Sequence, residues 1–71
     1  MQISQLAEIL SERVEKATKG ERVTQIHLFG IEFADEIGSS ANQIVDASEI
    51  DSSYATEVRK GMRLAKYVKL R

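Results

Sequence analysis

The amino-acid sequence predicts a mainly α-helical domain of four short helices, followed by a C-terminal extended segment that is a candidate for a minor β pairing. Three observations support this prediction. The 71 residues contain no proline, which would interrupt helix interiors. Apolar residues recur at three- and four-residue spacing along most of the chain. Short breaks containing glycine or serine separate these stretches, and because no linker divides them we expect residues 1–71 to form one domain.

The first helix is expected to begin at Ser4, whose side chain can cap it, and to end near Thr18. Its apolar residues share one face and its charged residues occupy the other, the apolar ones being Leu6, Ile9, Leu10, Val14 and Ala17. Gly20 then interrupts the pattern, and glycine is the residue that most readily adopts the left-handed conformation ending a helix. A turn is therefore predicted at residues 19–21.

The second helix is predicted from about Gln25 to Glu36, with Thr24 as its cap. The start is ambiguous, because residues 23–28 have a composition that a strand also tolerates. Helical spacing of the large apolar side chains favours a buried helix, these being Ile26, Phe29, Phe33 and Ile37. Gly30 inside a helix costs about 1 kcal/mol relative to alanine, so we expect it to mark the close approach of another backbone.

A third, shorter helix follows a break at residues 38–40. Ser40 and Gln43 have the spacing of a capping box, in which each side chain accepts a hydrogen bond from the other residue's backbone amide. This spacing predicts a helix from about Ala41 to Ser48.

The fourth helix is predicted to run from a cap at Asp51 or Ser52 to about Lys60, and Gly61 is expected to end it. The tail at residues 62–71 is compatible with a strand, a short helix or an arm, and we favour an extended segment that packs its apolar side chains on the core. Its pairing partner would be the start of the second helical stretch, at residues 23–26. Two short helices separated by about three residues precede this tail.

The third and fourth helices have the pattern of a helix-turn-helix, in which the second helix presents its first residues to the DNA major groove. Ile44 and Val45 supply the buried face of the first helix, and Ile50 anchors the turn. The inner face of the second helix consists of Tyr54, Ala55 and Val58. The residues left outward on it are polar or charged, namely Ser52, Ser53, Thr56, Glu57 and Lys60.

Residues 44–63, IVDASEIDSSYATEVRKGMR, resemble the phage-repressor-like, or Xre-type, helix-turn-helix family. The positions that match its pattern, or lie next to it, are Ile44, Ile50, Tyr54, Val58, Gly61 and Arg63. The chain departs from the pattern at Val45, where alanine is usual, and at Glu49, where the turn usually has glycine and a different turn conformation is expected. The wider chain is similar to small bacterial proteins described as having an HTH-like domain, a resemblance that implies the fold and brings no assigned activity.

Charge is divided unevenly along the chain, although the net charge is only −1. Residues 1–56 carry four basic and ten acidic side chains, and residues 57–71 carry six basic side chains and one acidic side chain. These two segments therefore have net charges of −6 and +5. Such segregation is typical of a local surface that faces a polyanion, whereas complementing a helix dipole would account only for the basic residues nearest the helix end.

Together, the motif and the charge predict a regulator that binds double-stranded DNA, with a homodimer as the candidate assembly. The residues expected to contact bases are Ser52, Ser53, Thr56 and Glu57, and those expected to contact phosphates are Arg59, Lys60, Arg63, Lys66 and Lys69. Tyr67 is expected to pack on the core, with base stacking as the alternative. The competing function is a protein-interaction or antitoxin-like adaptor module with the same fold and no DNA binding.

Several function classes are disfavoured by composition. The chain has no cysteine and a single histidine, His27, so neither a metal centre nor a cofactor is predicted. No arrangement of nucleophile and base is recognisable, and a chain this short has little room for a deep pocket, so neither an enzyme nor a small-molecule substrate is expected. The longest apolar run is far below the roughly 20 residues of a membrane span, and a cytoplasmic protein without membrane contact is expected.

Overall fold

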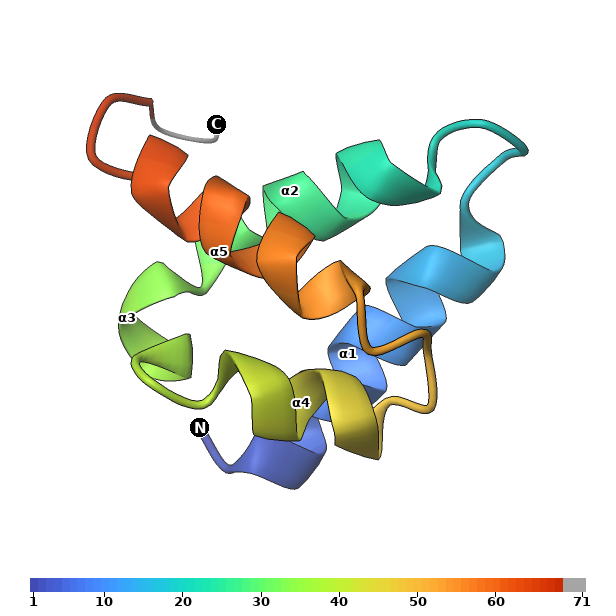
Figure 1. The fold of residues 1–71 in the computed structure, drawn as a ribbon, viewed down its shortest axis with the longest axis horizontal. Coiled ribbons are helices and arrows are strands. Elements are labelled where there is room, and N and C mark those ends of the chain that lie inside the picture. Colours follow the sequence, from blue (N-terminus) through green and yellow to red (C-terminus); the bar gives the residue numbers. More distant parts are fainter. Residues whose placement is uncertain (69–71) are drawn as a thin grey trace.

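The computed structural model describes residues 1–68, and it confirms a mainly α-helical fold. Five helices follow one another, α1 (Ile3–Lys16), α2 (Arg22–Glu32), α3 (Ala34–Ile37), α4 (Ala41–Ala47) and α5 (Tyr54–Leu64). No strand occurs within residues 1–68, so the β pairing predicted for the tail is not formed by the part of the tail that is described. Figure 1 shows α4 and α5 on the near side of the molecule, with α1 behind them and α2 crossing behind α5.

Helix α1 buries Leu6, Leu10 and Val14 of the predicted stripe, whereas Ile9 and Ala17 are only partly buried and Ala17 lies just beyond the helix. It begins at Ile3, one residue before the predicted cap at Ser4, because the Gln5 side-chain oxygen accepts the backbone amide of Gln2 and extends the first turn. It ends at Lys16, short of the predicted Thr18. The predicted turn is confirmed, because Gly20 has a φ of +92°, in the left-handed region.

The predicted second helix is divided into α2 and α3 at Phe33, whose φ of −112° lies outside the helical range. Of the predicted apolar pattern, Ile26, Phe29 and Ile37 are fully buried, and Phe33 at the break is partly buried and packs against the same core. The predicted cap at Thr24 was wrong, since the chain is already helical from Arg22 and the Gln25 amide donates to the Glu21 carbonyl.

Helix α4 has nearly the predicted bounds, and Ser40 precedes it, but the predicted capping box is not formed. The side chain of Ser40 makes no capping hydrogen bond. Its φ of −98° and ψ of 14° differ from the extended conformation that brings a capping hydroxyl over the amides of the first turn.

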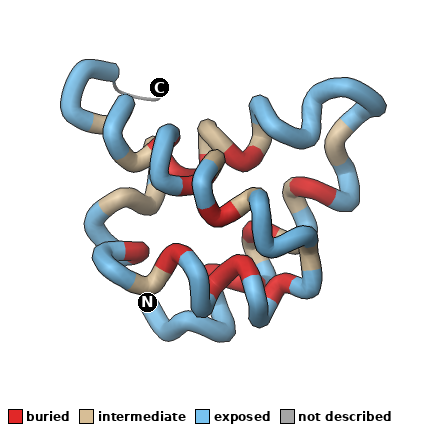
Figure 2. Tube along the Cα trace, in the orientation of Figure 1, coloured by how far each residue is buried: buried red, intermediate tan, exposed pale blue. Residues whose placement is uncertain are grey.

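The core is a single cluster on the inner faces of α1, α2, α4 and α5, with Ile37 of α3 completing it (Figure 2). Its largest fully buried side chains are Phe29, Leu6, Leu10, Ile26, Ile37, Ile44, Val45 and Val58. The predicted buried faces of both helices of the motif are thereby confirmed, and Ile50 and Tyr54 pack against the cluster from its edge.

Gly61 was predicted to end the last helix, but this prediction was wrong, because α5 continues through Gly61 to Leu64. The structure gives this glycine another role, at the point where α5 crosses α2. A Cβ added to Gly30 would lie 2.5 Å from the carbonyl oxygen of Val58, and one added to Gly61 would clash with the backbone of His27. Only glycine at both positions lets the two backbones approach this closely, so the close approach predicted for Gly30 is confirmed.

Within the described part of the tail, residues 62–64 continue α5 and residues 65–67 form a turn, so the extended segment predicted there is not seen. The amides of Tyr67 and Val68 both donate to the carbonyl of Leu64, which coils the chain back on the end of α5. Tyr67 is 82% exposed, so the expectation that it packs on the core was wrong. The predicted phosphate contact Lys69 lies outside the described residues, as do the last two residues of the tail.

Candidate nucleic-acid interface

The helix pair α4–α5 is built around a loop at residues 48–53 that keeps the two helices distinct. The buried Ser48 hydroxyl donates to the Val45 carbonyl at 2.8 Å and closes the end of α4. Glu49 then has a φ of +63°, which is the left-handed conformation that glycine most readily adopts. The different turn conformation expected from glutamate at this position is not seen, because Glu49 itself takes a left-handed backbone.

The start of α5 is prepared by Asp51. Its side-chain oxygen accepts a hydrogen bond from the backbone amide of Ser53 at 2.9 Å. This hydrogen bond is the main cause that lowers the pKa of Asp51, and a hydrogen bond from the Ser53 side chain is the second. The helix begins at Tyr54, one residue later than a cap at Ser52 would give and two later than a cap at Asp51 would give. Ser52 and Ser53 are therefore in the turn that leads into the helix, where both are exposed.

The two sides of α5 differ sharply in burial. Ala55, Val58 and Gly61 are buried and face the core. Thr56, Lys60 and Arg63 are exposed, and their spacing of four and three residues places them on one stripe on the opposite side of the helix. A helix that turns a polar, cationic stripe outward while its other side is held in the core has the form of a recognition helix.

Glu57, predicted as a base contact, is directed toward α2. Its carboxylate lies 2.7 Å from Nε2 of His27, and its side chain is 23% exposed. The hydrogen bond from His27 is the main cause that lowers the pKa of Glu57, and the nearby Lys60 ammonium, at 3.5 Å, acts in the same direction. The sequence did not indicate this pair, because His27 and Glu57 are thirty residues apart and meet only through the α2–α5 crossing.

Arg59, another predicted phosphate contact, lies on the flank of α5 nearest α4. Arg59 donates to the side-chain oxygen of Asn42, so this guanidinium is held across the two helices of the motif. Lys66 is exposed in the turn after the helix. Asn42 was not identified from the sequence, although its place in the first turn of α4 is where an outward polar residue of the motif would lie.

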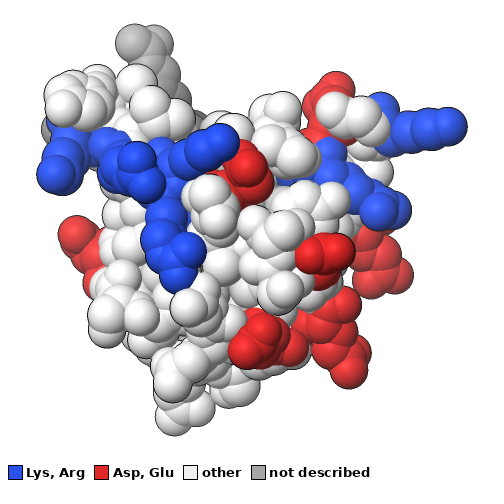
Figure 3. Space-filling view, in the orientation of Figure 1, with Lys and Arg blue, Asp and Glu red and all other residues white. Residues whose placement is uncertain are grey.

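The surface charge follows this geometry. Figure 3 shows lysine and arginine side chains gathered over α5 and its C-terminal end, with a smaller group near the turn between α1 and α2. Aspartate and glutamate dominate the lower right of the same view. The exposed cations of this region are Arg59, Lys60, Arg63 and Lys66, and all but the last belong to α5. The charge segregation predicted from the sequence is therefore also a spatial segregation.

Two short helices that pack at an angle on a third and fourth, with a polar stripe outward on the second, define a helix-turn-helix domain. A protein-family model described as "HTH-like domain" matches residues 2–71, and the chain belongs to this family. No curated protein and no solved structure matches the chain. None of the helices within residues 1–68 is long and apolar enough to span a membrane.

Proposed function

We propose that this protein binds double-stranded DNA by placing α5 in the major groove, and that it regulates transcription in this way. The observation that supports the proposal is the exposed stripe of Thr56, Lys60 and Arg63, which lies opposite the buried side of the same helix. A helix whose inner side is fixed in the core can present such a stripe without rotating. Polar groups on it can then reach base edges while the cations contact phosphates.

Within this proposal the predicted contacts divide by position. Ser52, Ser53 and Thr56 surround the start of α5, the part of a recognition helix that enters the groove, and they contact bases. Arg59, Lys60, Arg63, Lys66 and Lys69 contact phosphates. We assign Glu57 a positioning role, because its bond to His27 holds the flank of α5 on α2 and its second oxygen lies near Lys60.

The finer predictions remain part of the proposal. The Xre-type resemblance supports a repressor-like mode of docking, in which two copies bind half-sites about 34 Å apart, one turn of DNA. A homodimer would present two α5 helices to these half-sites. Light scattering of the protein with and without DNA tests the stoichiometry, and a 1:1 complex at saturation would remove the dimer from the proposal.

The salt dependence of binding to mixed-sequence duplex DNA tests the main claim. Each phosphate neutralised contributes about −0.9 to the slope of log affinity against log salt concentration, so four to five contacts per protomer give about −4. Arg63→Ala should make this slope about 1 unit less steep. The matched control is Lys19→Ala, which removes one positive charge from the exposed turn between α1 and α2 and should leave the slope unchanged.

The result that would end the proposal is the absence of binding at low ionic strength. Equal losses from Arg63→Ala and Lys19→Ala would also contradict it, because they would show that total charge, and not the α5 surface, attracts the DNA. Thr56→Ala distinguishes base contacts from phosphate contacts. It should lower affinity for a selected operator sequence and leave the salt slope as it is.

A further inference from the structure

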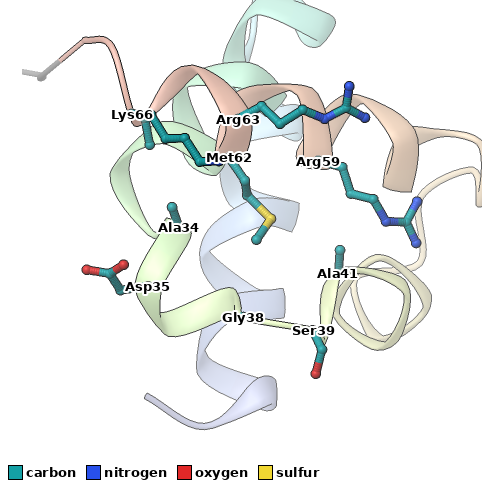
Figure 4. A pocket seen from close by; sticks show the side chains of 10 residues that line it. Ala34, Asp35, Gly38, Ser39, Ala41, Arg59, Met62, Arg63 and Lys66 are labelled. Atoms are coloured by element: carbon teal, nitrogen blue, oxygen red, sulfur yellow. The ribbon is translucent and has the colours of Figure 1, made fainter.

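A groove runs between the C-terminal half of α5 and the segment that joins α3 to α4. Its volume is about 510 Å³, and it is open to solvent. Figure 4 shows the Met62 side chain pointing from α5 into the space bounded by Ala34 of α3 and Ala41 of α4. Ala65 adds to the same apolar lining. The floor of the groove is thus made of aliphatic groups and one thioether.

The rim of the groove is positively charged on the α5 side, where Arg59, Arg63 and Lys66 line it. One carboxylate, that of Asp35, is among the lining residues, and Figure 4 shows it pointing away from Met62. The guanidinium of Arg59 is held by Asn42 at the α4 end. An occupant therefore meets cations along one edge and apolar surface beneath.

We propose that this groove is a docking site for an acidic segment of a partner protein, one that carries aliphatic side chains between its carboxylates. Carboxylates complement the three cations of the rim, and an aliphatic side chain complements the apolar floor. A DNA phosphate complements only the cations and leaves the floor uncovered. Methionine suits such a site because its flexible, polarizable side chain adapts to ligands of differing shape.

The shape of the groove favours a peptide over a small molecule. Small-molecule sites enclose about 70–90% of their ligand, which an open groove does not do. An extended or helical segment, in contrast, needs contact along one side only. The groove shares the cations Arg59, Arg63 and Lys66 with the surface proposed to contact DNA phosphates. Its apolar floor is distinct from that surface, because Met62 points toward α3 and α4 while Thr56 and Lys60 are exposed on the outward stripe.

The test uses two fluorescein-labelled heptapeptides of equal charge, one alternating glutamate with leucine and the other alternating glutamate with serine. Binding to the full chain is followed by fluorescence anisotropy at low salt, with no DNA present, so a failure of the DNA-binding proposal does not affect the result. The leucine peptide should bind at least about tenfold more tightly, which corresponds to the burial of about one aliphatic side chain. Equal affinity for the two peptides, or no binding of either, would overturn the proposal.

Variants locate the binding in the groove. Lys66→Glu reverses an exposed charge on the rim and should weaken the leucine peptide about three- to tenfold, and Lys19→Glu, the same reversal at a distant turn, should leave it unchanged. Ala34→Glu places a carboxylate beside Met62 and should abolish most of the binding, with a circular dichroism melt to show that it folds. If Lys66→Glu and Lys19→Glu weaken binding equally, the peptide is attracted by net charge and the groove is not its site.

Discussion

The crossing of α2 and α5 makes Gly61→Ala the most informative single substitution in this fold. In an ordinary helix interior this change stabilises by about 1 kcal/mol, because alanine is the better helix former. Here the added methyl group would meet the carbonyl oxygen and Cα of His27. These are backbone atoms of a neighbouring helix, so no side-chain rotation relieves the clash, and the two helices must move apart.

The cost can be estimated from the geometry. Ordinary van der Waals contact begins at 3.4 Å, so α5 must retreat from α2 by roughly 1 Å. A gap of about 0.5–1 Å already forfeits a quarter to a half of the dispersion energy of the atoms that line it. Overpacking at a site that cannot relax costs up to about 3 kcal/mol, and after the gain in helix propensity a net loss of about 2 kcal/mol remains. For a domain of this size, that loss lowers Tm by about 8–16 °C.

Thermal and urea unfolding followed by circular dichroism measure this loss. Gly20→Ala is the control, because a methyl group there meets nothing within 4 Å and only its φ of +92° opposes the substitution. The control should therefore cost about 1 kcal/mol. A Gly61→Ala protein that is as stable as the parent, or more stable, would show that Gly61 is an ordinary helical glycine and would refute the argument.

Three further substitutions test other features. Glu49→Gly should raise the free energy of unfolding by about 1 kcal/mol, measured by urea titration, because Glu49 occupies a left-handed conformation; an unchanged or lower midpoint would contradict this. Because the pKa of Glu57 is lowered in the folded protein, this carboxylate stabilises the fold fully above pH 4.5, the ordinary pKa of the group. That stabilisation is lost as the pH falls through the lower pKa of the folded state. Melts from pH 6 to 3 should accordingly show a flatter loss of Tm for Glu57→Gln than for the parent, and parallel curves would count against it. Arg13→Ala should cost about 1 kcal/mol in the same urea assay, because the guanidinium donates to both oxygens of Glu32 and lies 5.4 Å from the centre of a phenylalanine ring; no change would show that the pair is only a solvated contact.

The helix-turn-helix core could be predicted from the sequence because its signal is local. Ile44, Val45 and Val58 lie at spacings that any helical placement turns to one side, and all three are fully buried. The same helical spacing predicts the outward stripe of α5, because residues on the side opposite the buried face are turned toward solvent. Spacing alone therefore separates the buried residues of α4 and α5 from the outward ones.

The sequence did not predict the features that depend on which segments pack against each other. Gly61 has the same local appearance whether it ends a helix or admits a neighbouring backbone, and only the position of His27 decides between these roles. The partner of Glu57 is hidden for the same reason. The break at Phe33 also could not be predicted, because a straight helix and a broken one have the same periodic pattern of apolar residues, and packing against the rest of the core decides between them.

The α2–α5 crossing also explains how so small a domain can hold a recognition helix in one orientation. With two phenylalanines and no tryptophan, the chain has few large side chains to fill the space between helices. Paired glycines remove that space, and close backbone contact then restrains α5 against rotation about its own axis. The hydrogen bond between Nε2 of His27 and Oε1 of Glu57, 2.7 Å long, restrains the side of α5 that faces α2. A rotation that moved Thr56 away from the solvent side would have to separate both contacts at once, so the orientation of the outward stripe depends on α2 more than on α4, its partner in the motif.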